Sequence, residues 1–252
     1  FCNIYLLIVD YKKILLLSNA NVGIAGAYSI HIEKAPFMVS IRLNGTFHSC
    51  GGSIIDSWFI LTAAHCLNDF KNVSRDYEFK VLAGTDHING GGHPYDVKKI
   101  YIHERYNNQT LDYDVGLIRL KDPLEFGAKV KKVYLPPSKI KLSRRIRLNV
   151  TGWGSTGVII SPNLLQAEIP LVWKQNCKKT YAKAHRNITS RMICAGEIDH
   201  TSCQGDSGGP LTLGNVQVGV TSFGLGCGMY PGVFTRVASM VPWLNRKMKM
   251  LH

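Results

Sequence analysis

The chain has 252 residues and a formal net charge of +13 at pH 7, and 45% of its residues are hydrophobic. This length allows one large domain, or two small ones, with a substantial core, and no segment is polar and long enough to indicate disorder. No stretch is long and apolar enough to cross a membrane, so we expect no membrane partner.

The N-terminal segment opens with an apolar run over residues 1–9, which is too short to span a bilayer and is followed by Asp10 and Lys12. We interpret residues 1–23 as the remnant of a signal peptide or propeptide. A propeptide retained for packing is the alternative interpretation.

Short apolar or alternating runs follow along the rest of the chain, separated by Gly, Pro, Asn or Asp. They are Phe37–Leu43, Ser53–Leu61, Phe79–Leu82, Val115–Leu120, Ile146–Thr151, Gln166–Trp173, Pro210–Leu213, Val216–Ser222 and Gly232–Val237. Such runs are typical of β-strands and predict an all-β sandwich or barrel. The one predicted helix starts at Val237, where apolar residues recur at three- and four-residue steps up to Leu251. Pro136-Pro137 is the predicted boundary between two halves of about six strands each.

Six of the seven cysteines lie in three pairs that are local in the sequence, and Cys2 stands apart. An even set in the body of the chain indicates disulfides and an oxidising compartment, and no pair has the C-x-x-C spacing typical of zinc sites. Glycosylation sequons add weak support at Asn44, Asn72, Asn108, Asn149 and Asn187. We expect a secreted, extracellular protein.

Much of the positive charge lies in one stretch. Its cations are Lys129, Lys131, Lys132, Lys139, Lys141, Arg144, Arg145 and Arg147. Such a stretch can hold anionic glycans or nucleic acid. A solvated connector between two domains explains it better, because no nucleic-acid-binding motif or interleaved aromatic residues accompany it. We expect no nucleic-acid partner and keep anionic glycans as an alternative.

Three motifs have the residue types that nucleophilic acyl transfer requires. Ser207 lies in CQGDSGGP, residues 203–210, where glycines allow a tight turn with backbone N–H groups beside the hydroxyl. His65 lies in the string LTAAHC, residues 61–66, at the end of an apolar strand, where the neighbouring Cys66 can tie down a general base. Asp114 leads an apolar strand, and a carboxylate drawn into the interior there needs a partner such as a histidine N–H.

The order His, Asp, Ser and these three strings resemble the chymotrypsin/trypsin family of serine proteases over about Ile24 to Leu251. The resemblance implies a protease domain over 24–252, with two six-stranded antiparallel Greek-key β-barrels and a C-terminal α-helix. The barrels are expected at about 24–135 and 136–236, and the helix at about 237–252. It further implies a monomer without a cofactor that acts on protein or peptide substrates and meets protein protease inhibitors.

By this resemblance His65 is the general base, Asp114 orients it and Ser207 is the nucleophile. The backbone N–H groups of Gly205 and Ser207 form the oxyanion hole. Ser222 matches the serine that hydrogen-bonds the triad aspartate.

The resemblance also assigns structural parts of the site. The backbone from Ser222 through Phe223 to Gly224 pairs with the substrate as an added strand. GWG, residues 152–154, matches the strand that leads into a loop beside the site. The expected disulfides are Cys50–Cys66, Cys177–Cys194 and Cys203–Cys227.

The predicted specificity rests on Thr201, which lies six residues before Ser207, at the base of the family's primary pocket. Threonine carries no charge, and the expected walls Gly224 and Gly232 leave room for a large side chain. We therefore predict cleavage after large apolar residues. A shifted loop that brings Asp199 into the pocket is the alternative, and it predicts trypsin-like specificity.

In this family a new N-terminal ammonium pairs with the aspartate before the nucleophile, here Asp206. The matching N-terminus is Ile24, but Gly23 precedes it where Arg or Lys is usual. This departure keeps a catalytically silent, protease-shaped binding protein as the alternative to an active enzyme. We predict no metal, because the stretch that matches a calcium loop offers only Asp86 and Asp96 as carboxylates.

Overall fold

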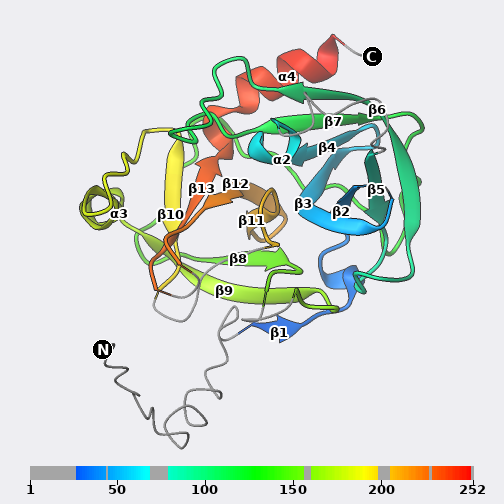
Figure 1. Ribbon diagram of the computed structural model, residues 1–252, viewed down its shortest axis with the longest axis horizontal. Helices are drawn as coiled ribbons and strands as arrows, with labels where there is room; N and C mark the ends of the chain where they lie inside the picture. The colour runs from blue at the N-terminus through cyan, green and yellow to red at the C-terminus, as the bar shows by residue number, and fades with distance from the viewer. Residues whose placement is uncertain are drawn as a thin grey trace, which may run out of the picture.

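The structure is a computed structural model that describes residues 27–43, 45–68, 79–155, 160–197, 205–226 and 229–250. Two β-barrels lie side by side (Figure 1). The elements in chain order are β1 (Tyr28–Ser29), η1 (Ile32–Lys34), β2 (Met38–Leu43), β3 (Phe47–Asp56), β4 (Phe59–Thr62), α2 (His65–Asn68), β5 (Phe79–Ala83), β6 (His93–Ile102), β7 (Gly116–Leu120), β8 (Arg147–Gly152), β9 (Leu165–Val172), α3 (Lys174–Ala182), β10 (Met192–Ala195), β11 (Pro210–Leu213), β12 (Val216–Phe223), β13 (Gly232–Arg236), η2 (Val237–Ser239) and α4 (Val241–Lys249).

The first barrel closes in the order β2-β3-β4-β7-β6-β5, and every neighbouring pair is antiparallel. Its strands form because β-branched and aliphatic residues bury one side of the sheet. Ile41, Ile54, Ile60 and Leu117 are fully buried in this core. Closure removes the exposed edges that an open sheet would present.

The second barrel repeats this strand order. In the seven-stranded sheet β1-β9-β10-β13-β12-β11-β8, an additional β9–β8 pairing closes the six strands that follow β1 into a ring. β1 is added outside the ring, with Tyr28 opposite Gln166 of β9. The predicted fold class, two six-stranded antiparallel barrels with a C-terminal helix, is confirmed.

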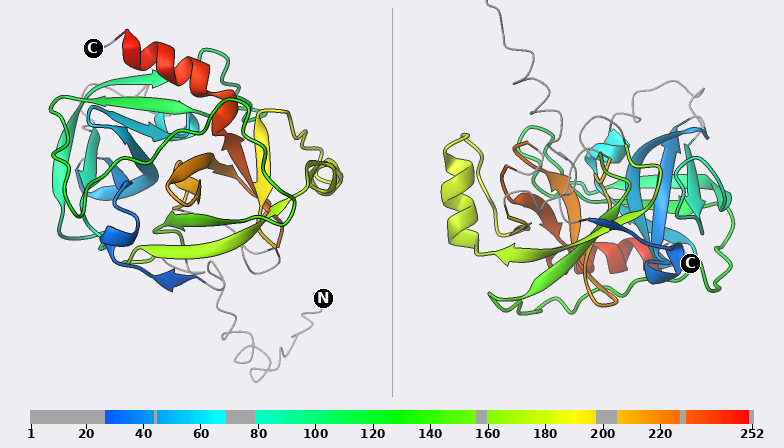
Figure 2. Two further views of the ribbon diagram at one scale, coloured as in Figure 1. Left: turned by 180° about the vertical axis from the view of Figure 1, so that it is seen from behind. Right: turned by 90° about the horizontal axis from the view of Figure 1, so that it is seen from below.

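The two ends of the described chain cross between the barrels. β1 pairs with the second barrel, and the chain then enters the first one at β2. At the other end, α4 follows the last strand of the second barrel but lies across β6 and β7 of the first (Figures 1 and 2). Trp243 and Leu244 of α4 are buried in the core of the first barrel. Each end therefore holds the two barrels together.

Polar contacts join the barrels directly. The buried hydroxyl of Ser53 in β3 donates to Gln217 Oε1 in β12 at 2.6 Å. The connector is also joined to the second barrel, because Tyr134 forms a parallel bridge with Val216. The division at Pro136-Pro137 stays a prediction; the barrel strands flank it, since β7 ends at Leu120 and β8 begins at Arg147.

Several element predictions were wrong. The predicted run Ser53–Leu61 is two strands, β3 and β4, because the Asp56 carboxylate accepts a hydrogen bond from the Trp58 N–H and turns the chain. β6 was missed because its side chains are partly exposed and do not form an apolar run. β10 (Met192–Ala195) was also missed.

The helix predictions also need correction. The helix expected at about 237–252 begins as the 3₁₀ turn η2, and α4 starts only at Val241. Pro242 suits the first turn of α4, because N–H groups there have no partner within the helix and proline has no N–H. α3 was not predicted at all, although Cys177 and Tyr181 are buried four residues apart, as on one helix face. Among the residues that the structure describes, no helix reaches the length and apolarity needed to cross a bilayer.

A hydrogen-bonded carboxylate fastens α4 to the first barrel. Glu104 accepts hydrogen bonds from the Trp243 indole at 2.7 Å and from Lys247 Nζ at 2.6 Å. Burial opposes ionisation of this carboxyl, but the contacts with Lys247 and Trp243 outweigh it and lower the pKa of Glu104 from 4.5 to about 2. The interaction therefore stabilises the folded state above pH 4.5 and is lost as the pH falls through about 2.

We expect Glu104→Gln to lower the free energy of unfolding at pH 7 by about 0.5 to 1 kcal/mol, a small value because the ion pair is half-exposed and screened. The free energies of unfolding of Glu104→Gln and of the parent chain should become equal as the pH falls through about 2. Urea unfolding at several pH values measures them, with Glu125→Gln at an exposed position as the control. A difference that does not change with pH would contradict this account.

Candidate active site

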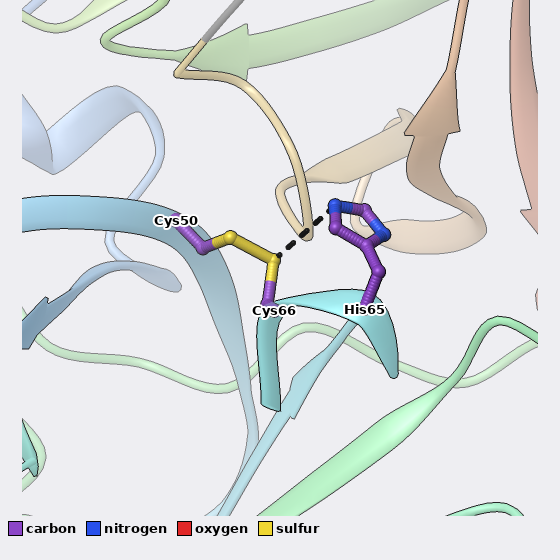
Figure 3. Close-up of side chains that lie close together, drawn as sticks. All are labelled: Cys50, His65 and Cys66. Carbon is purple, nitrogen blue, oxygen red and sulfur yellow. Dashed lines mark hydrogen bonds between the residues drawn. A yellow bond between two sulfur atoms is a disulfide. The ribbon is translucent and has the colours of Figure 1, made fainter. Parts of the chain in front are cut away.

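His65 lies at the start of α2, three residues after Thr62 ends the apolar strand β4. The next residue, Cys66, forms a disulfide with Cys50 of β3. Figure 3 shows the imidazole beside this disulfide, with Nε2 3.7 Å from Cys66 Sγ. The side chain is 27% exposed, so one edge of the ring reaches solvent. The disulfide and the strand fix the backbone from which the imidazole projects.

Asp114 is fully buried and lies directly before Val115 and β7. His65 Nδ1 donates to Asp114 Oδ2 at 2.8 Å, and the His65 backbone N–H donates to Oδ1 at 2.9 Å. The Ser222 hydroxyl in β12 donates to Oδ2 at 2.5 Å. A buried carboxylate needs such donors, because an unpaired one would cost several kcal/mol. With the proton on Nδ1, the neutral ring keeps Nε2 as an acceptor.

The turn that carries Ser207 packs against the end of β4. The Ser207 carbonyl accepts a hydrogen bond from the Gly51 N–H at 2.8 Å. Gly208 has a φ of +77°, and a Cβ there would lie 2.2 Å from Thr62 Oγ1, so only glycine fits. Since Thr62 ends the strand that leads to His65, the structure brings the segments that carry His65, Asp114 and Ser207 together. The Ser207 side chain is partly exposed.

His48 of β3 was not singled out from the sequence, yet it touches this turn. Its Nε2–H donates to the Gly205 carbonyl at 3.0 Å, and its Nδ1 pairs with the Ser40 hydroxyl at 2.8 Å. Burial, more than any other influence, lowers the pKa of His48, so the ring is neutral at pH 7. These contacts orient the Gly205 peptide. A histidine two residues before Cys50 was the only signal in the sequence.

Asp206 is fully buried, and its carboxylate packs against Gly152 and Gly154. Its Oδ1 accepts a hydrogen bond from the Gly154 N–H at 2.9 Å. A Cβ at Gly152 or Gly154 would lie 2.2 or 2.1 Å from a carboxylate oxygen, so the GWG motif provides the space that the carboxylate occupies. The expected partner of Asp206, the N-terminus at Ile24, lies outside the described residues.

The expected substrate-binding residues are described in part. Ser222 and Phe223 end β12, and Gly224 follows with open space where a Cβ would be. Gly232 begins β13 and pairs with Ala195 of β10. Thr201, Asp199 and the pair Cys203–Cys227 lie outside the described residues.

Tyr181 of α3 supports this region and was also missed. Its hydroxyl donates to the Pro231 carbonyl at 2.6 Å, and its ring meets the Phe223 ring edge-on at 5.7 Å. Burial raises the pKa of Tyr181 to about 12, so the hydroxyl stays a donor at neutral pH. The disulfide Cys177–Cys194 joins α3 to β10.

An ion pair holds the loop before Asp114. The Arg191 guanidinium binds both carboxylate oxygens of Asp112, and the Thr189 hydroxyl donates to the same group at 3.0 Å. Burial works against ionisation, but these contacts outweigh it and lower the pKa of Asp112. Tyr113, at a φ of +56°, packs against the guanidinium of Arg191. The backbone that delivers Asp114 is thus fixed from the second barrel.

The carboxylates considered for calcium have protein partners. Asp86 accepts hydrogen bonds from His31 and the Ile32 N–H, and Asp96 pairs with Lys80 and Lys121. Among the described residues, the ligand-type atoms of Cys50, His65 and Cys66 also lie together, but the two sulfurs are bonded to each other and are not thiolates. The absence of a metal stays a prediction.

The fold and these motifs define a serine protease domain, and the chain belongs to the trypsin family: the family's model, Trypsin, matches residues 24–244. The predicted resemblance is confirmed. The chain is 37% identical over 228 residues to Trypsin 5G1 of Aedes aegypti, and the matched region covers 88% of this chain and 84% of that protein. The chain is also 40% identical over 231 residues to Clotting factor G beta subunit of Tachypleus tridentatus, and here the matched region covers 83% of this chain and 74% of that protein.

The space around Asp206 gives a test of the site's packing. Gly154→Ala should lower the free energy of unfolding by about 1 to 3 kcal/mol, because the new Cβ displaces a buried carboxylate. Gly127→Ala is the matched control, since a Cβ there meets nothing within 4 Å, and it should change stability by less than about 0.5 kcal/mol. Equal effects of the two substitutions in denaturant unfolding would show that the glycine is not required.

Proposed function

We propose that the chain is a secreted serine endopeptidase that cleaves peptide bonds through an acyl-enzyme. In this proposal His65 Nε2 takes the proton of the Ser207 hydroxyl as the oxygen attacks the scissile carbonyl, and later returns it to the leaving amine. Asp114 holds the ring in the required tautomer and stabilises the imidazolium. Protein substrates follow from the family, and secretion is supported by the two disulfides.

The observation that carries the proposal is the set of donors around the buried Asp114 carboxylate. Two come from His65 and one from Ser222. The ring donor directs Nε2 away from Asp114, as a general base requires. A merely structural aspartate would not need the imidazole of a partly exposed histidine as its partner.

The backbone of the Ser207 turn supports the proposed oxyanion hole. Gly205 has a φ of +94°, a conformation that L side chains rarely adopt. His48 holds its carbonyl. We propose that the N–H groups of Gly205 and Ser207 donate to the developing oxyanion, where each pre-oriented donor contributes about 3 kcal/mol.

The proposed specificity is for large apolar residues before the cleaved bond. It is supported by the uncharged Thr201 in the sequence and by the open space at Gly224. Activation is proposed to follow cleavage between Gly23 and Ile24, with the new ammonium pairing with Asp206.

Active-site labelling tests the proposed nucleophile. With the residues before Ile24 replaced by the site of an added protease, the processed chain should react with an organophosphonate probe at Ser207, as read by mass spectrometry. Ser207→Ala should abolish labelling, and Asp114→Asn should slow it by about 10⁴-fold, because the amide favours the wrong tautomer of His65.

The unprocessed chain is the control and should label far more slowly. If a correctly processed and folded chain does not react, the proposed enzymatic activity is wrong, and the alternative of a catalytically silent binding protein is favoured.

Peptide substrates that differ only in the residue before the cut test the specificity. We expect kcat/KM to be at least about tenfold higher after Phe than after Arg, because the pocket base carries no charge to pair with a buried guanidinium. Thr201→Asp should reverse this order. Faster cleavage after Arg by the unaltered chain would favour the alternative in which Asp199 reaches the pocket.

A further inference from the structure

A cavity lies in the second barrel, apart from the proposed active site. Its volume is about 300 Å³, the lower end of the range of ligand sites. It opens between the connector, the end of β9, β10 and the start of α3, and Figure 2 shows α3 at the edge of the barrel that faces away from the first barrel. None of its lining residues belongs to the proposed catalytic or substrate-binding set.

The floor of this cavity is apolar. Ile140 and Leu142 of the connector, Leu171 of β9 and Ile193 of β10 line it, and all four side chains are partly exposed. Burying an apolar side chain in such a site contributes about 1.5 to 3 kcal/mol. The cavity can therefore accept one aliphatic or aromatic side chain.

The rim of the cavity is cationic. Lys174 and Arg236 line it. Burial lowers the pKa of Lys174, and repulsion from Lys178, Arg236 and Arg191 lowers it further, so these four cations are crowded together. Asp112 neutralises Arg191. Within the described part of the chain, Lys174 and Lys178 form no ion pair, and Arg236 donates only to a carbonyl and a hydroxyl.

An aromatic platform adjoins the same rim. Trp173, which lines the cavity and precedes α3, is 40% exposed. The guanidinium of Arg144 lies 4.0 Å from the centre of its ring. This contact places one cation of the basic stretch beside the cavity and holds it against the tryptophan.

We propose that this cavity is a docking site for an acidic peptide segment of a partner protein, with one apolar side chain in the cavity and flanking carboxylates over Lys174, Lys178 and Arg144. Charge complementarity requires an anionic occupant. The apolar floor favours a peptide over a sulfated glycan, which has no apolar side chain to bury. Residues 1–23 of this chain do not fit, because Asp10 is their only acidic residue.

The docking site does not depend on catalysis, so it is tested on the full chain carrying Ser207→Ala. The probes are fluorescein-labelled acetyl-Glu-Glu-Phe-Glu-Glu-amide and the same peptide with Gly in place of Phe, in about 0.15 M salt, where distant charges are screened. Fluorescence anisotropy should give a Kd about tenfold lower for the Phe peptide.

Matched variants distinguish binding in the cavity from nonspecific electrostatic binding to a basic protein. Lys174→Glu should weaken binding of both peptides by about tenfold, whereas Lys183→Glu, an exposed charge reversal just after α3 and outside the cavity lining, should change it by less than about twofold. Ile140→Asn should remove the advantage of the Phe peptide over the Gly peptide. Ser190→Trp, at an exposed position of the lining, should do the same by filling the cavity.

Three outcomes would overturn the proposal. The first is equal binding of the Phe and Gly peptides, and the second is equal loss in Lys174→Glu and Lys183→Glu. The third is displacement of the Phe peptide by a heparin oligosaccharide whose own binding is unchanged in Ser190→Trp, which would assign the surface to anionic glycans. Failure of Ser207 labelling would leave this result unaffected, so the two proposals can fail separately.

Discussion

The structure depends on keeping one carboxylate charged in the interior of the protein. Asp114 has no exposed surface, and its donors come from the loop after β4 in the first barrel and from β12 in the second. Its carbonyl also accepts a hydrogen bond from the Thr235 hydroxyl of β13. Both barrels must therefore be assembled before this charge is satisfied, and the free energy that stabilises the carboxylate also orients His65. Folding and the proposed chemistry share these contacts.

Two other acidic residues beside the site, one buried and one partly exposed, are also held by hydrogen bonds. Asp206 occupies the space left by Gly152 and Gly154, and Asp112 is held by Arg191. Asp206 directly precedes Ser207 in the sequence, and Asp112 lies two residues before Asp114. Each of these carboxylates is bound by a segment that is distant in the sequence. The buried Asp206 and the partly exposed Asp112 thus fix the backbone on both sides of the site, at Ser207 and at Asp114. This explains how short loops can present side chains in a defined arrangement.

The sequence predicted the two-barrel class and the residues of the proposed triad, because the strings around His65, Asp114 and Ser207 are local and specific. It did not predict the residues that support them. His48 contacts Gly205, which is 157 residues away, and Arg191 contacts Asp112 across 79 residues. Neither pair has a local pattern, because only the packing of the barrels makes them neighbours. α3 was missed for a related reason. Its two buried residues pack against β10 and β13, and this packing cannot be read from the local sequence.

The position of the proton on the neutral His65 ring decides whether this residue can act as the general base. Nitrogen NMR of the folded chain with labelled histidine, at a pH where the ring is neutral, distinguishes the two tautomers. We expect the proton on Nδ1, facing Asp114, and we expect Asp114→Asn to move it to Nε2. A ring that carries its proton on Nε2 in the unaltered chain would rule out His65 as the general base, because Nε2 would then have no lone pair with which to accept the serine proton.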